Sequence, residues 1–136
     1  MPATAQEIAI AVARLNRRLR QERHSELTPT QLSVLGAMTV AGPVTPGALA
    51  AREKVSPPSI TRTLGGLVEL GLVDKSAHPD DGRQVVVSVS DLGTKVLAEE
   101  RERRDAWLYL RLQEMDAHDR EVLAEAAQIL TRLAES

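Results

Sequence analysis

Hydrophobic residues recur with a helical period near both ends of the chain. Residues 5–23 are predicted to form a helix, because large aliphatic residues recur there at steps of four, three and four positions. This first stripe consists of Ile8, Val12, Leu15 and Leu19. A last helix is predicted from His118 to Ala134, with a stripe that includes Val122, Leu123, Leu130 and Leu133. The two ends of one chain can cover each other, but stripes this long favour contact with a second subunit.

Three helix starts of one kind lie between these ends, each a Thr or Ser followed by Pro. They are Thr28-Pro29, Thr45-Pro46 and Ser56-Pro57. The hydroxyl residue caps the helix, Pro suits the first helical position, and Gln31 completes a capping box with Thr28. The predicted helices end near Gly42, Lys54 and Gly71. Their core-facing positions are Leu32, Leu35 and Met38 in the first helix, Leu49 in the second, and Ile60, Leu64, Leu67 and Val68 in the third.

The hydrophobic period then changes from helical to extended. Residues 72–76 look extended, residues 78–82 have turn chemistry, and Val85, Val87 and Val89 alternate with their neighbours. Ser90 then begins a long helix that continues to about Leu112, and a break at residues 115–117 precedes the last helix.

This order of elements predicts a mostly α protein with a small β-hairpin wing. Two helices joined by a tight turn and followed by a hairpin form a winged helix-turn-helix. We expect residues 28–96 to form the winged DNA-binding region, and residues 1–27 and 97–136 to form the helical dimerisation region of one compact chain. The predicted dimerisation residues are the two stripes, Ile8, Val12, Leu15, Leu19, Val122, Leu123, Leu130 and Leu133.

The helix after Ser56 presents a small, polar face opposite its apolar face. In a helix-turn-helix this second helix enters the major groove, where Ser and Thr hydroxyls meet base edges and Arg62 reaches guanine or a phosphate. The candidate DNA contacts on it are Ser56, Pro57, Pro58, Ser59, Thr61, Arg62 and Thr63. Gly65 and Gly66 cost about 1 kcal/mol each against Ala, which makes sense if the backbone needs close approach. A capped core helix with small surface residues is the alternative.

The tip of the predicted hairpin carries one basic residue. Arg83 follows Asp80-Asp81-Gly82, where a wing arginine can enter the minor groove. Asp81 can support it through an ion pair. A solvated turn charge is the alternative interpretation of Arg83.

The length and composition of the chain predict one domain with one hydrophobic core. It has 136 residues, of which 43% are apolar and 26% are charged. The absence of Cys excludes disulfides, thiol chemistry and Cys-ligated zinc. The apolar run from Ile8 to Ala13 is too short for a signal peptide or a membrane span. We therefore expect a soluble, unexported, cytoplasmic protein with no membrane contact.

The net charge of −2 is unusual for a nucleic-acid binder, but the charge is unevenly distributed. Residues 1–96 carry eleven Lys and Arg against nine Asp and Glu, whereas residues 97–136 carry six against ten. A local surface can therefore be more favourable to DNA than the whole chain.

Metal and catalytic chemistry are not indicated by the sequence. His24, His78 and His118 are dispersed without ligand spacing, and the exposed pair Asp80-Asp81 is better explained as a turn. No nucleophile elbow, phosphate loop or HExxH motif is present. We expect no metal, no cofactor and no enzymatic activity.

The segment around the wing resembles the MarR family of transcription regulators. The family pattern is D-x-R-(x5)-L-T-x-x-G. This chain follows it from Asp81 to Gly93, with Arg83 in the arginine position, Val89 in place of Leu and Ser90 in place of Thr. Residues 55–62, then Leu67 and residues 71–73, resemble the family's recognition helix and its exit into the wing, and residues 28–38 resemble its second helix. The resemblance covers nearly the whole chain. Members often carry Arg-Arg at the wing tip, so Gly82 implies the loss of one phosphate contact.

The resemblance implies a homodimer whose two winged lobes read a pseudo-palindromic operator in double-stranded DNA. It also implies repression relieved by a small effector, often an anionic or aromatic acid. Arg14, Arg17 and Arg18 can attract such an anion, although a solvated basic face is the common alternative. Trp107 and Tyr109 lie near a pocket or pack in the dimer region.

A second hypothesis is a winged-helix module that binds another protein and has little DNA affinity. Residues 28–96 favour it, because six positive and six negative charges make them neutral. Arg83 and the small polar face around Thr61 favour the DNA-binding hypothesis.

Overall fold

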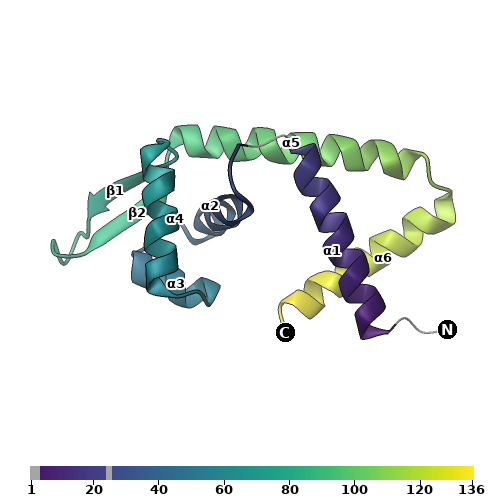
Figure 1. Ribbon diagram of the computed structural model, residues 1–136, viewed down its shortest axis with the longest axis horizontal. Helices are drawn as coiled ribbons and strands as arrows, with labels where there is room; N and C mark the ends of the chain where they lie inside the picture. Colours follow the sequence, from purple (N-terminus) through teal and green to yellow (C-terminus); the bar gives the residue numbers. More distant parts are fainter. Residues whose placement is uncertain (1–3, 24–25) are drawn as a thin grey trace. The chain divides into compact units, whose positions relative to one another are not determined.

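The computed structural model describes residues 4–23 and 26–136 (Figure 1). The described residues form six helices and one hairpin: α1 (Ala5–Glu22), α2 (Pro29–Ala41), α3 (Pro46–Glu53), α4 (Pro57–Glu69), β1 (Val73–Ala77), β2 (Val85–Val89), α5 (Asp91–Gln113) and α6 (Ala117–Ala134). The predicted mostly α, winged helix-turn-helix fold is confirmed. The extended segment begins one residue later than predicted, at Val73, and the last helix begins one residue earlier, at Ala117.

The chain divides into two compact units. One, the winged unit, spans residues 23–102, and the other, the terminal unit, combines residues 1–22 with residues 103–136. Helix α5 runs from the winged unit into the terminal unit. The unit boundaries fall a few residues from the region boundaries predicted at 27/28 and 96/97.

Helix caps fix where the helices of the winged unit begin. Thr28 and Gln31 form the predicted capping box, with Gln31 N–H donating to Thr28 Oγ1 at 3.1 Å and Thr28 N–H donating to Gln31 Oε1 at 3.0 Å. Thr45 and Ser56 cap α3 and α4 in the same way, each accepting from a backbone N–H three residues on. Each cap satisfies a backbone donor that a helix start leaves unpaired.

The core of the winged unit collects one apolar face from each of its elements. Its fully buried large side chains are Leu35, Met38, Leu49, Ile60, Leu67 and Val87. They come from α2, α3, α4 and β2, which are the faces that the helical and extended periods predicted. Helix α4 is therefore held in the winged unit by the burial of one face.

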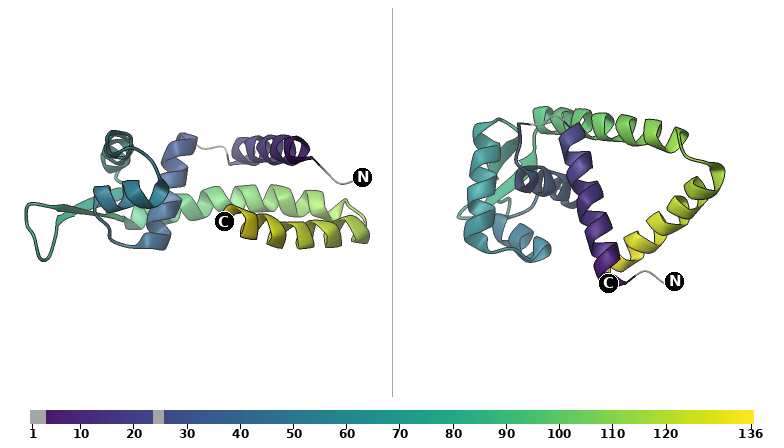
Figure 2. Two further views of the ribbon diagram at one scale, coloured as in Figure 1. Left: turned by 90° about the horizontal axis from the view of Figure 1, so that it is seen from below. Right: turned by 45° about the vertical axis from the view of Figure 1, so that its right-hand side comes forward.

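The wing is an antiparallel hairpin whose register pairs Val73 with Val89 and Ala77 with Val85. An isolated bridge ties it to the helices, because Val44 and Val87 exchange backbone hydrogen bonds of 3.0 and 2.8 Å. The hairpin tip projects beyond α2, α3 and α4 in Figure 1 and in the left view of Figure 2. The base of the wing is thus fixed while its tip stands clear of the core.

The junction between wing and α5 is tightly packed around Ser90 and Gly93. Ser90 Oγ donates to Gly71 O at 2.6 Å and accepts from Gly93 N–H at 3.0 Å. A Cβ on Gly93 would overlap the carbonyl oxygen of Leu72 and lie 2.9 Å from Val89 Cγ1. The family-like Ser-x-x-Gly spacing therefore has a packing cause in this fold.

The terminal unit buries much less of its apolar surface. Among the described residues, neither α1 nor α6 has a single buried side chain. Leu19 is half-buried, whereas the other seven residues of the two stripes are exposed, from 40% at Leu130 to 61% at Leu133.

Candidate nucleic-acid interface

Helix α4 separates a buried face from an exposed polar face. Ile60, Leu64 and Leu67 are at most 3% exposed, so they anchor the helix in the core. Ser59, Thr61 and Arg62 are exposed, and Thr63 is half-buried. The first turn is also exposed, including Ser56, Pro57 and Pro58. These positions agree with the geometry in which the second helix of the motif is inserted into a DNA groove.

Hydroxyl groups at the start of α4 are linked to one another. Ser56 Oγ donates to Ser59 Oγ at 2.9 Å, and Thr63 Oγ1 donates to Ser59 O at 3.0 Å. The turn before the helix contains Lys54 in the left-handed region, with φ of 57°. No sequence pattern predicts this conformation, because non-glycine residues rarely adopt it.

The two glycines of α4 differ in their surroundings. A Cβ on Gly66 would lie 3.1 Å from Gln31 Nε2, whereas a Cβ on Gly65 would meet no atom within 4 Å. Packing within the chain therefore explains why position 66 is a glycine, but it does not explain the glycine at position 65.

The wing tip presents its arginine to solvent. The Arg83 side chain is 95% exposed, and Asp81 Oδ1 accepts from Arg83 N–H at 3.1 Å and lies 3.5 Å from Arg83 Nε. His78 Nδ1 accepts from the N–H groups of Asp80 and Asp81 at 3.0 and 3.2 Å. The backbone bond orders the turn, and the long side-chain contact leaves the guanidinium available to an outside partner. The sequence did not predict that the His78 side chain accepts these two backbone hydrogen bonds in the turn.

The exposed stripes of α1 and α6 meet at a groove, which we call the terminal groove. It has a volume of about 800 Å³ and is lined by Ala5, Ile8, Ala9, Val12, Ala13, Asn16, Leu130, Thr131, Leu133 and Ala134. Four of the eight predicted dimerisation residues line it. Exposed apolar side chains gathered along one groove are typical of an interaction site.

The three arginines predicted to attract an anion have unequal surroundings. Arg18 Nη2 lies 2.7 Å from Glu22 Oε1, and the Arg18 guanidinium also lies 5.0 Å from the centre of the Trp107 ring. Arg111 lies 5.6 Å from the same ring centre. Arg14 and Arg17 are exposed. The charge of Arg18 is therefore already compensated, and Trp107 is enclosed between two cations.

Trp107 and Tyr109 have different environments in the terminal unit. Trp107 is half-buried and its Nε1 has no hydrogen-bond partner among the described residues, whereas Tyr109 is 62% exposed. Neither residue lines the terminal groove.

The described part of the chain holds no group of three or more His, Asp or Glu side chains placed to bind a metal. His24 lies outside the described residues. Among the same described residues, no helix combines the length and the hydropathy needed to cross a bilayer.

An exposed polar helix α4 beside a wing whose arginine is exposed is typical of the winged helix-turn-helix class of DNA-binding proteins. A MarR family model matches residues 25–84. An uncharacterised HTH-type transcriptional regulator of Mycobacterium bovis is 42% identical over 132 residues, which cover 96% of this chain and 92% of that protein. The chain belongs to the MarR family and is a transcriptional regulator.

Two solved structures are similar over nearly the whole chain. A Pseudomonas aeruginosa protein proposed to be a transcriptional regulator has 34% identity and a TM-score of 0.83, and the match covers 98% of this chain and 99% of that one. A mutant MarR from E. coli complexed with operator DNA has 23% identity and a TM-score of 0.70, with 93% and 89% of the two chains covered. The second likeness concerns the fold.

Proposed function

We propose that this regulator is a homodimeric repressor that binds a pseudo-palindromic operator and is released by a small ligand. The observation that carries the proposal is the pairing of the exposed α4 face with the 95% exposed Arg83 side chain on an ordered wing. Major-groove and minor-groove contacts can then be made by one winged unit.

Each candidate residue has a proposed role in this complex. Thr61 and Arg62 read base edges, because both are exposed on the outer face of α4. Ser56 and Ser59 contact a phosphate at the start of the helix, where backbone N–H groups favour an anion. Thr63 adds a further hydroxyl to these phosphate contacts, and Pro57 and Pro58 make close contact with the sugar–phosphate backbone. Arg83 enters the minor groove, where Asp81 supports it.

The proposed dimer buries the apolar stripes of α1 and α6 against those of a second copy. An intramolecular core does not cover them, since seven of the eight stripe residues are exposed. Contact between identical surfaces related by a two-fold axis would also explain a two-fold symmetric operator. Residues 1–27 and 97–136 then serve dimerisation, and residues 28–96 serve DNA binding.

We further propose a cytoplasmic location and release from DNA by a small anionic or aromatic effector. The exposed Arg14 and Arg17 support an anion, whereas Arg18 contributes less because Glu22 pairs with it. Titrating the regulator–DNA complex with benzoate tests this part, and the double variant Arg14→Ala, Arg17→Ala should abolish release by benzoate.

A gel-shift titration tests the DNA-binding part of the proposal. Purified protein is titrated onto its own upstream DNA at two salt concentrations, with random DNA as competitor. We expect a discrete shift that survives the competitor and weakens as salt rises, because phosphate contacts release counterions. If that DNA gives no specific shift, selection from genomic fragments follows. Failure of both experiments would contradict the proposal and favour a protein-binding module.

A further inference from the structure

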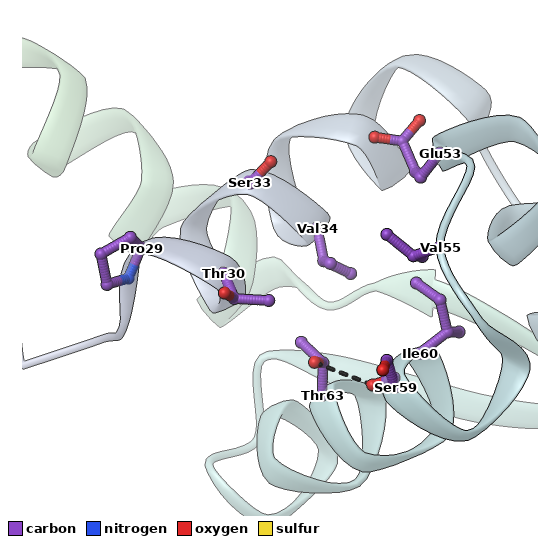
Figure 3. Close-up of a pocket in the computed structure, with 9 residues that line it drawn as sticks. All are labelled: Pro29, Thr30, Ser33, Val34, Glu53, Val55, Ser59, Ile60 and Thr63. Carbon is purple, nitrogen blue, oxygen red and sulfur yellow. Dashed lines mark hydrogen bonds between the residues drawn. The ribbon is translucent and has the colours of Figure 1, made fainter. Parts of the chain in front are cut away.

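A small pocket lies within the winged unit, between α2, the end of α3 and α4 (Figure 3). Its volume is about 340 Å³, near the lower end of the range of roughly 300–1,000 Å³ for small-molecule sites. Space of this size fits one or two aromatic rings. We call it the α2–α4 pocket.

The middle of the α2–α4 pocket is apolar and its edges are polar. Val34, Val55 and Ile60 lie between the two edges in Figure 3, with Ser33 and Glu53 along one edge and Ser59 and Thr63 along the other. An apolar floor with a few polar groups at the edges is typical of sites that bind small organic molecules.

The charge of the pocket selects among such molecules. Glu53 is half-buried, and its side-chain carboxylate has no hydrogen bond or ion pair within the described part of the chain. No Lys or Arg lines the pocket. An anionic ligand would be repelled by this carboxylate, whereas an ammonium group would form a charge-assisted hydrogen bond with it.

We propose that the α2–α4 pocket binds a small aromatic amine and that its occupant competes with DNA. The competition rests on the proposed function, since Ser59 and Thr63 line the pocket and are also proposed DNA contacts. A ligand over these side chains covers them and fills the space between α2 and α4. The charge of this ligand is opposite to that of the anionic effector proposed above.

The ligand preference is tested first without DNA. Three probes share one ring system and differ in charge: naphthylmethylamine, naphthylmethanol and naphthoate. Each is titrated into the full chain while backbone amide resonances are followed by NMR. We expect shifts concentrated at Ser33, Val55, Ile60 and Thr63, with the amine binding about tenfold tighter than the alcohol and naphthoate binding weakest. Equal binding of naphthoate and the amine, or shifts elsewhere, would overturn the proposal.

A matched pair of variants tests the role of the carboxylate. Glu53→Gln should weaken amine binding about tenfold and leave binding of the alcohol within about twofold. Glu69→Gln is the control, because Glu69 is an exposed carboxylate on α4 that does not line the pocket. Equal losses in both variants would contradict the site, since they would indicate general charge attraction. Thermal melts followed by circular dichroism establish that both variants are folded.

The effect on DNA is measured separately, by titrating the amine into the protein–DNA complex. We expect DNA affinity to fall as the pocket fills, and Glu53→Gln to require about tenfold more amine for the same loss. Amine binding that leaves DNA affinity unchanged would overturn the competition. If the protein binds no specific DNA, the proposed function fails, and the titration without DNA still decides whether the pocket binds the amine.

Discussion

The winged unit and the terminal unit use similar apolar residues in different ways. All thirteen residues of the hydrophobic core described here, from Leu32 to Leu97, belong to the winged unit. Helices α1 and α6 of the terminal unit have strong apolar stripes, yet none of their described residues is buried. The proposed second copy of the chain would cover these stripes, whereas the core of the winged unit lies within one chain.

This difference separates two kinds of mutational effect. A change in the winged unit should alter the stability of the chain itself, because its side chains already contact one another. A change in the apolar stripes should alter the association of chains and leave the winged unit folded.

The largest expected effect is a loss of stability at Gly93. The variant Gly93→Ala places a Cβ against Leu72 O and Val89 Cγ1, so we expect it to destabilise the chain by about 3 kcal/mol or more in chemical denaturation. Gly82→Ala is the matched control, since a Cβ there meets no atom within 4 Å and we expect a change within about 0.5 kcal/mol. Similar stabilities for both variants would contradict the close packing described around Gly93.

The next effect concerns the terminal groove. Val12→Glu places a charge among the apolar side chains that line this groove, so we expect the dimer dissociation constant to rise at least about 100-fold in sedimentation equilibrium. Gln6→Glu adds the same charge on α1 to a residue that does not line the groove, and should leave dimerisation unchanged. A Val12→Glu protein that stays dimeric would exclude the groove from the interface.

A smaller effect is expected at the wing. Arg83→Ala should weaken operator binding by about 1–3 kcal/mol and reduce sequence preference where the minor groove faces the wing. Its stability should not change, because the side chain is 95% exposed. Binding curves from fluorescence anisotropy measure the loss, and Arg83→Lys separates the charge from the shape of the guanidinium. Unchanged affinity in Arg83→Ala would remove the wing from the interface.

The smallest expected effect distinguishes the two glycines of α4. Gly65→Ala should stabilise the fold by up to about 1 kcal/mol, because Ala favours helix and a Cβ there meets no atom. It should also weaken operator binding, if the backbone approaches DNA at this position. Gly66→Ala should gain less stability, since its Cβ meets Gln31 Nε2. A Gly65→Ala protein with wild-type operator affinity would show that no close approach occurs there.

Much of the winged unit could be predicted from local sequence. The caps at Thr28, Thr45 and Ser56 depend on residues within one turn, and the hairpin depends on alternation within five residues, so short patterns identify both. The core positions Leu35 and Leu49 followed from helical period for the same reason.

Features that depend on long-range contacts could not be predicted. The bridge between Val44 and Val87 joins residues far apart in the chain, and the left-handed Lys54 lies in the tight turn between α3 and α4. Glu100 is 5% exposed although its helix is rich in charge, so no apolar period signalled its burial. The enclosure of Trp107 between Arg18 and Arg111 also depends on α1 and α5 meeting in space.

The candidate site was likewise predictable only where it depends on local sequence. The exposed face of α4 and the position of Arg83 followed from helical period and turn chemistry. The α2–α4 pocket did not, because it is formed by side chains from three helical segments that no local pattern brings together.

The most direct test is a hydroxyl-radical footprint of the wild-type protein on an operator selected from genomic fragments. Two winged units joined through the terminal helices should protect two half-sites whose centres lie about one helical turn, roughly 34 Å, apart. Protection of the flanking minor grooves should disappear with Arg83→Ala, while protection of the half-site centres remains. A single protected half-site, or a footprint that Arg83→Ala leaves unchanged, would contradict a dimer that reads DNA with both α4 and the wing.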